Sequence, residues 1–209
     1  MEKPPPNQRQ ELTSDLKKEF HDLEYKELVC DHEQITSKEF YTCSFTKCSF
    51  RETVFTNCKF RDCIFINCDL NLAKVPDSLF QTTIFKSTQL IGINWAAAKW
   101  PKATFLKPFE FQECVLNYST FIGLKLKGLI LRKCVAKDVD FSEADLAQAD
   151  CRDTDFSQSR FVETDLTAAD FTHAYGYQIN PNLVTLKGTK FSLPEAMALL
   201  YGLDIEITE

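Results

Sequence analysis

Long apolar runs, glycine, methionine and histidine are all scarce in this 209-residue sequence. No stretch approaches the roughly 18–20 consecutive apolar residues of a membrane helix. The start, MEKPPPNQRQELTSD, has no apolar segment of the kind that a secretory signal peptide carries. We therefore expect a cytoplasmic protein with no membrane partner. The formal net charge of −6 argues against nucleic acid as a partner and leaves basic proteins open.

The residues needed for catalysis are also missing or scattered. The three histidines, His21, His32 and His173, lie far apart, and none has a cysteine or serine nucleophile in local register. The six glycines form no phosphate-binding motif. We therefore expect no catalytic site, no cofactor and no enzymatic activity.

Cysteine, by contrast, is abundant. The chain has nine cysteines, an odd number, and no export signal. Because a reducing compartment keeps thiols free, the sequence favours free cysteines over a disulfide framework.

The dominant feature is a repeat of five residues. A large apolar residue, here called the centre, recurs at every fifth position from Phe40 to Phe105. The phase then slips by one residue within LKPFE, and the repeat resumes from Phe111 to Phe171. Two residues before most centres stands a small residue, as in YTCSFTKCSF. The exceptions are Ile93, Phe109, Leu124, Leu129 and Val139.

Neither a helix nor a flat strand buries residues at this spacing. A period of 3.6 scatters five-spaced residues around a helix, and a period of 2 sends them to alternate faces. A chain that turns a corner once per five residues buries every centre and every small partner together. The pattern therefore predicts a solenoid whose coils stack about 4.8 Å apart.

These residues resemble the pentapeptide-repeat family. ADLAQADCRDTDFSQSRFVETDLTAADF, residues 144–171, follows the family pattern A(D/N)LXX closely, and KCSF and NCKF are its Cys/Phe variant. The resemblance implies an all-β fold, a right-handed quadrilateral β-helix with four pentapeptides per coil. The columns expected from it are Phe40, Phe60, Phe80 and Trp100; Phe45, Phe65, Phe85 and Phe105; and Leu126, Leu146, Leu166 and Leu186.

The pattern divides the chain into four parts. We expect a flexible tail over residues 1–14, an N-terminal cap over 15–39 and the β-helix over 40–191, with a bulge near 106–110 where the register slips. Residues 192–209 should form a C-terminal cap, with a helix that Ser192 and Glu195 begin as a capping box and a short strand after it. The apolar residues of this cap exceed what one edge needs, and similar family members pair through their C-termini. The predicted homodimer interface comprises Leu193, Met197, Leu200, Leu203, Ile205 and Ile207.

The cysteines fit the interior of such a solenoid. Seven of the nine stand at the small inward position. A right-angled turn every five residues sends successive thiols to different walls, and two thiols on one wall do not make a tetrahedral metal site. We interpret them as interior packing residues, with a disulfide or a metal site as the less favoured alternatives.

Charge is uneven along the chain. Residues 136–171 carry ten acidic and three basic residues, whereas residues 40–135 are net positive. An aspartate just before the centre can hydrogen-bond the turn, so the acidic residues have a structural explanation as well as a functional one. The predicted partner-binding band comprises Asp138, Asp140, Glu143, Asp145, Asp150, Asp153, Asp155, Glu163, Asp165 and Asp170.

Two functional hypotheses remain. The resemblance extends to the Qnr-type, gyrase-protecting members, and it implies a dimeric rod whose central acidic surface mimics B-DNA toward DNA gyrase or another DNA-binding protein. The alternative is a structural or scaffolding protein with an unknown protein partner. This chain departs from those members in its net positive arms, its Pro-rich start and the unbroken spacing of its first fourteen centres, which leaves no room for projecting loops there.

Overall fold

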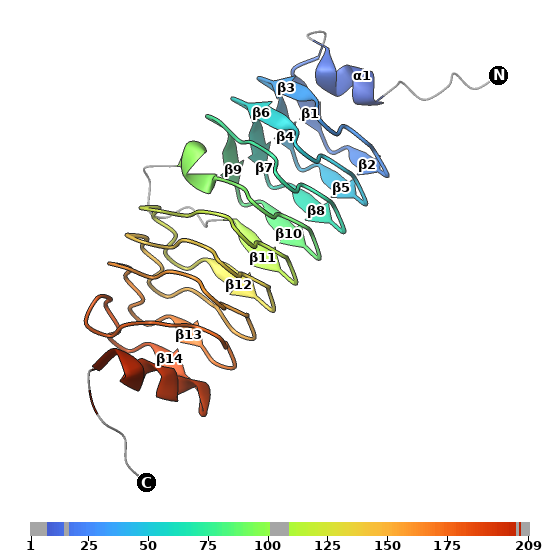
Figure 1. The fold of residues 1–209 in the computed structure, drawn as a ribbon. Helices are drawn as coiled ribbons and strands as arrows, with labels where there is room; N and C mark the ends of the chain where they lie inside the picture. Colours follow the sequence, from blue (N-terminus) through green and yellow to red (C-terminus); the bar gives the residue numbers. More distant parts are fainter. Residues whose placement is uncertain (1–7, 15–16, 101–108, 204, 206–209) are drawn as a thin grey trace, which may run out of the picture.

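The computed structural model describes residues 8–14, 17–100, 109–203 and 205, and the chain winds into a square rod (Figure 1). No helix in these ranges is long and apolar enough to cross a membrane. The helical elements are α1 (Gln8–Thr13) and the 3-10 helices η1 (Trp95–Ala97) and η2 (Glu195–Leu203). The strands are β1 (Glu19–His21), β2 (Glu24–Lys26), β3 (Gln34–Thr36), β4 (Glu39–Tyr41), β5 (Ser44–Thr46), β6 (Val54–Thr56), β7 (Lys59–Arg61), β8 (Ile64–Ile66), β9 (Leu79–Gln81), β10 (Ile84–Lys86), β11 (Glu110–Gln112), β12 (Ile130–Arg132), β13 (Asp170–Phe171) and β14 (Lys190–Phe191).

Every strand pair is parallel, and the pairing confirms the predicted β-helix. Phe20 pairs with Phe40, and Phe40 with Phe60, so that one coil takes twenty residues. We number the four walls in the order in which the chain reaches them. Wall 1 contains β1, β4, β7 and β9; wall 2 contains β2, β5, β8, β10, β11 and β12, and further on β13 and β14; wall 3 has isolated bridges such as Val29↔Ser49; and wall 4 contains β3 and β6.

The corners are made by backbone in the left-handed region. The residue two after a centre has a positive φ, as in Asp22 (54°) and Asn57 (53°). Its N–H donates to a carbonyl of the next coil; Asp22 N–H, for example, bonds Tyr41 C=O at 3.0 Å. This bond helps offset the cost of left-handed backbone for residues other than glycine. A turn at every fifth residue follows from this recurring conformation.

Aromatic rings fill the tube as the repeat predicts. Phe40 and Phe60 stack with ring centroids 4.8 Å apart, and Phe45 and Phe65 stack at 4.5 Å. Each of these rings is at most 1% exposed. Leu126, Leu146 and Leu166 are also buried, and Leu186 is partly buried, in the expected leucine column.

The register slip proves larger than one residue. Phe85 stacks on Phe111, with centroids 5.4 Å apart, and the strand register pairs the same two residues. The column of Phe45, Phe65 and Phe85 therefore continues with Phe111, and Phe105 lies outside the described residues. The coil from Phe85 to Phe111 is six residues longer than the others, so the wall-1 end of this coil accommodates an insertion. Trp100 is only partly buried beside it.

The N-terminal part of the prediction was wrong in two respects. Residues 19–38 form a complete coil rather than a cap, because Phe20, Tyr25 and Ile35 are buried centres in register with the coil that follows. The cap is α1, which covers the first coil (Figure 1) and whose Leu12 is 1% exposed. Residues 8–14 are thus ordered, and residues 1–7 of the predicted tail lie outside the described part.

The C-terminal cap is a helix, but of a different kind. Residues Glu195–Leu203 form a 3-10 helix instead of an α-helix. The hydroxyl of Ser192 accepts from His173 N–H at 2.8 Å, and Ser192 C=O accepts from Ala196 N–H, so the predicted capping box is not formed. Leu203 belongs to this helix rather than to a strand, and Ile207 lies outside the described residues.

Candidate functional site

Aspartates precede the centres on all four walls of the C-terminal coils. Each accepts a hydrogen bond from the backbone N–H two residues on, as Asp145 does from Ala147 (3.1 Å) and Asp165 from Thr167 (2.8 Å). These bonds satisfy backbone donors at the corners. The carboxylates with this role are Asp140, Asp145, Asp150, Asp155, Asp165 and Asp170.

Four of these six carboxylates are also paired with basic residues. Asp150 accepts from both Arg132 and Arg152, the latter at 2.8 Å. The bond from Arg152, with a further bond from Arg132, lowers the pKa of Asp150 well below its usual range despite partial burial. The other three pairs are Arg160–Asp140 at 3.1 Å, Lys137–Asp155 at 3.2 Å and Lys190–Asp170 at 3.7 Å. These four carboxylates therefore stabilise the coils and are already neutralised by basic residues.

The remaining acidic residues of the predicted band lie at corners. Asp138, Glu143, Asp153 and Glu163 have left-handed backbone and are exposed. In the described part of the chain, none of these four has a salt bridge.

Two neighbouring pairs of band residues that have no salt bridge among the described residues lie together. Glu143 and Glu163 follow one another on the corner between walls 4 and 1, where each N–H bonds the next coil. Asp145 and Asp165 pair directly beside them on wall 1. We call these four residues the acidic quartet. Asp165 has a pKa lowered by its bonds from Thr167, so it is ionised at neutral pH.

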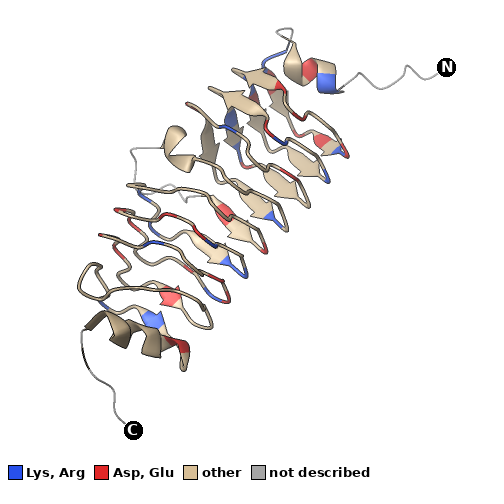
Figure 2. Cartoon of the chain, viewed as in Figure 1, with Lys and Arg blue, Asp and Glu red and all other residues tan. Residues whose placement is uncertain are grey.

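The predicted band is therefore a ring around the rod rather than one negative face. Asp150 and Asp170 lie on wall 2, Asp155 on wall 3 and Asp140 on wall 4. Figure 2 shows acidic and basic segments interleaved through these coils. The sequence predicted ten acidic residues in adjacent coils, but it did not distinguish the carboxylates that form salt bridges from the acidic quartet. Lys125 borders the quartet on wall 1, where it pairs with Asp145 in the ladder.

The C-terminal surface is apolar where the dimer interface was predicted. Leu193, Met197, Leu203 and Ile205 are exposed, and Leu200 is partly buried. Tyr201, which the sequence pattern did not single out, is also on this surface and is 84% exposed. Ala198 and Leu199 pack against the core instead. In the sequence, Tyr201 could have been noticed as an aromatic residue within a short apolar run. Only the 3-10 helix shows that its side chain lies on the solvent side.

All nine cysteines are free and buried, as expected for packing residues. The inward thiols donate to carbonyls of the preceding coil, as Cys43 does to Phe20 C=O at 3.4 Å. Among the residues that the structure describes, no group of three or more His, Cys, Asp or Glu side chains is arranged to hold a metal ion.

Two family models match the chain, one described as a pentapeptide repeat region over residues 38–121 and one as pentapeptide repeats over residues 137–172. Together they cover more than half of the sequence, and both describe the repeat seen in the coordinates. The chain belongs to the pentapeptide-repeat proteins. The comparison with curated proteins found no match.

Solved structures support the same fold. Trypsin-treated QnrB1, a plasmid-mediated fluoroquinolone resistance protein, is 19% identical with a TM-score of 0.62, and the match covers 92% of each chain. HetL, a pentapeptide-repeat protein involved in heterocyst differentiation regulation in the cyanobacterium Nostoc sp. strain PCC 7120, is 16% identical with a TM-score of 0.61. That match covers 83% of this chain and 87% of HetL. At these identities the likeness establishes the solenoid fold and a resemblance to Qnr-type members.

Proposed function

We propose that this protein is a non-enzymatic binding protein that presents its acidic quartet to a DNA-binding protein, with DNA gyrase as the first candidate. The supporting observation is that Glu143, Asp145, Glu163 and Asp165 form a two-by-two array of carboxylates that have no salt bridge within the described ranges. Lys125 and Lys127 lie near enough to help lower the pKa of Asp165. Stacked coils place neighbours about 4.8 Å apart. Such an array offers a basic protein groove a dense negative charge, which favours association through long-range attraction.

The second element of the proposal is a homodimer through the C-terminal cap. Leu193, Met197, Tyr201 and Leu203 expose apolar surface around η2, and a second copy would remove it from water. A twofold arrangement would bring two acidic quartets to one central region of a longer rod.

A gyrase supercoiling assay, with and without a fluoroquinolone, tests the first element. We expect the protein to alter supercoiling or to restore it in the presence of the drug. Glu143→Lys with Glu163→Lys should abolish this effect. The matched control is Asp62→Lys with Asp153→Lys, because these corner residues have the same left-handed backbone and lie away from the quartet. Equal loss in both double variants would contradict a role for the quartet.

Solution mass tests the dimer. The 24.0 kDa chain should behave as a dimer of twice that mass, and Tyr201→Asp or Leu200→Asp should return it to the monomer. A monomeric parent protein at micromolar concentration would rule out this element.

A scaffolding role for an unknown protein partner is the second candidate. It is favoured by the ion pairs that neutralise Asp140, Asp150, Asp155 and Asp170, since these leave most of the rod with mixed charge. An unchanged gyrase assay with the parent protein would favour this role.

A further inference from the structure

On wall 4 the backbone ladder between coils is interrupted. In the coil before, Phe55 N–H donates to Lys74 C=O at 2.8 Å, and Lys74 N–H donates to Thr53 C=O at 2.9 Å. One coil further on, no backbone hydrogen bond joins residues 73–75 to residues 93–95, all of which the structure describes. Val75 N–H and Ala73 C=O therefore have no hydrogen-bond partner in the part of the chain that the structure describes. Such unpaired groups are rare in buried backbone.

The interruption has a local cause. Asn94 C=O, which would continue the ladder, accepts from Ala97 N–H in the turn of η1, and the Asn94 side chain accepts from Ala96 N–H. Trp95 stacks above Val75 on this wall, and its side chain is larger. Its ring packs against that of Phe109, and the two ring centroids are 5.0 Å apart. On wall 3 the same two coils remain joined, since Leu70 N–H donates to Gln89 C=O and Leu72 N–H donates to Ile91 C=O. The two coils thus separate on wall 4 alone.

The separation leaves a groove of about 630 Å³. This volume is within the range of about 300–1,000 Å³ that is typical of ligand sites. Leu72 lies at one end, 50% exposed, and leans over Gly92 so closely that a Cβ there would meet its Cδ2 at 2.7 Å. Pro76 and Ala97 lie at the other end, and Glu52 of the coil before also lines the groove. Lys74 stands exposed at the rim, and no salt bridge to it is formed within the described residues. We call this space the wall-4 groove.

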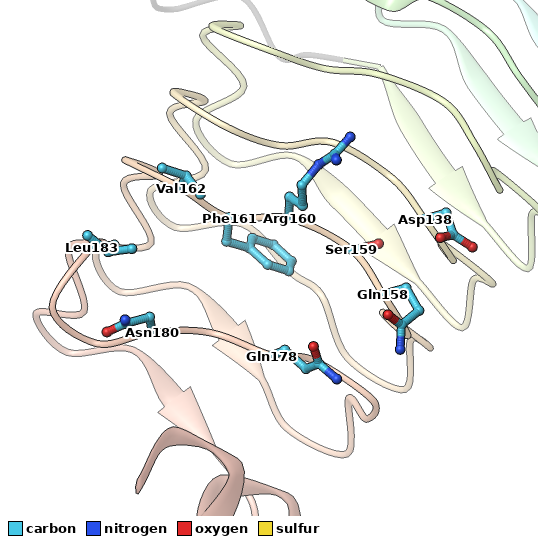
Figure 3. A pocket seen from close by; sticks show the side chains of 9 residues that line it. All are labelled: Asp138, Gln158, Ser159, Arg160, Phe161, Val162, Gln178, Asn180 and Leu183. Atoms are coloured by element: carbon cyan, nitrogen blue, oxygen red, sulfur yellow. The ribbon is translucent and has the colours of Figure 1, made fainter. Parts of the chain in front are cut away.

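The same break occurs a second time on this wall. No backbone hydrogen bond joins residues 159–161 to residues 179–181 within the described chain, and a groove of about 490 Å³ opens there. Figure 3 shows it between the coil that carries Phe161 and the coil that carries Asn180, with Val162 and Leu183 at one end. Arg160 takes the place of Lys74, but it pairs with Asp140 of the coil before. Only the first groove thus has a cation available to a ligand.

We propose that the wall-4 groove binds an extended peptide segment of a partner protein, one residue of which completes the interrupted ladder. Its N–H would donate to Ala73 C=O and its C=O would accept from Val75 N–H, the two bonds by which a residue pairs in a parallel ladder. Directly paired residues point to the same side of a sheet, so this residue's side chain lies beside Lys74. An acidic residue is complementary there. The two coils rejoin at both ends of the groove, where Leu72 N–H donates to Ile91 C=O at 2.8 Å and Asp77 N–H donates to Ala97 C=O at 2.9 Å. The peptide residues on either side of the paired one therefore turn outward over Leu72 and Pro76, which favour apolar side chains.

Titration of the ¹⁵N-labelled full-length protein with a blocked synthetic peptide, acetyl-Ser-Leu-Ala-Glu-Ala-Leu-Ser-amide, tests this proposal. We expect a saturable shift of the Val75 amide signal and slower hydrogen exchange at this amide when the peptide is bound. N-methylation of the peptide glutamate removes the donor to Ala73 C=O and should weaken binding by about tenfold or more. A Val75 signal that does not move at millimolar peptide overturns the proposal.

Two matched pairs of variants locate the site. Lys74→Glu should weaken binding about tenfold, because an attraction becomes a repulsion, whereas Lys125→Glu at the equivalent position of wall 1 should not change it. Leu72→Asn keeps a residue that tolerates left-handed backbone and removes the apolar end of the groove. Its control is Tyr118→Asn, on the same corner but outside the groove. Undiminished peptide binding by Lys74→Glu would overturn the proposal. This outcome would not bear on the gyrase assay, because the acidic quartet lies on another part of the rod.

Discussion

The N-terminal and C-terminal coils build the same tube from different interactions. Before the centres of the N-terminal coils stand β-branched residues such as Val54, Ile64 and Ile84, and these segments pair as strands. In the C-terminal coils the same position is often aspartate, and the ladder there consists mainly of isolated bridges. The corners differ accordingly. Ala144 N–H closes a turn onto Phe141 C=O at 3.0 Å, while most N-terminal corners lack such a bond.

The difference shows that hydrogen bonds at the corners can replace part of the stabilisation that large interior side chains provide. Stacked phenylalanines and β-branched walls stabilise the first coils through burial and extended backbone. Smaller centres, such as Ala136 and Cys151, bury less in the later coils, where aspartate-to-backbone bonds and ion pairs fix the corners instead. The C-terminal coils should therefore respond more to pH, and the N-terminal coils more to truncation of interior side chains.

The largest expected effect is on the aromatic column. Phe65→Ala should lower the free energy of unfolding by about 3–5 kcal/mol, because it opens a cavity between stacked rings. Cys151→Ala, on the same wall in the C-terminal coils, should cost about 1 kcal/mol, since it removes one small group. Urea unfolding monitored by circular dichroism measures both. Equal costs would show that the two halves do not differ in how they use burial.

The next effect concerns the corner aspartates. Asp150→Ala removes a carboxylate that accepts from the backbone N–H of Arg152 and contacts two arginines. It should lower the free energy of unfolding by about 1–2 kcal/mol. Asp69→Ala is the N-terminal counterpart. It also accepts from a backbone N–H, that of Asn71, but its arginine contact with Arg51 is longer, at 3.5 Å. A smaller loss for Asp69→Ala, from the same unfolding measurement, would support the comparison, and a larger loss would contradict it.

Acid should weaken the C-terminal coils first. The pKa values of Asp150 and Asp165 are lowered in the folded protein, by bonds from Arg152 and Thr167 respectively. Folding therefore gains stability from these groups above the unfolded value of about 3.9, and this gain is lost as pH falls below it. Hydrogen exchange at pH 3 should show earlier opening around residues 140–170 than around 40–85. Uniform opening along the rod would argue against this distribution.

The smallest effect is on thiol reactivity. All nine cysteines are at most 2% exposed. Burial raises the pKa of Cys30 to about 12 and of Cys58 to about 11, whereas the hydrogen bond with Cys63 lowers the pKa of Cys43 to about 7. Because a reagent must reach the sulfur as well as find it ionised, burial should make labelling of the native protein at pH 8 very slow in both halves. Labelling in denaturant gives the total number of thiols that can react, for comparison. Rapid reaction in one half would identify coils that open locally.

Much of the fold was predictable because the five-residue repeat is a local property. Most pentapeptides show one large and one small inward residue, so the tube, most of its interior columns and the buried cysteines follow from Phe40 onward. The first coil was missed because the residues two before its centres are not small. They are Lys18, Leu23, Leu28 and Glu33. The 3-10 helix was predicted as α because the same short apolar segment fits both periods.

What the sequence by itself determined is which side chains fill the tube, because the chain turns once per five residues and so points the same two positions of each pentapeptide inward. The tertiary structure alone decided where outward residues meet. The longer coil between Phe85 and Phe111 sets which residues of the first register stack on which residues of the second. Ion pairs between coils separate the acidic quartet from the other aspartates. The wall-4 groove is also invisible in sequence, since Ala73, Lys74 and Val75 form a regular repeat and only the coil stacked on them fails to pair.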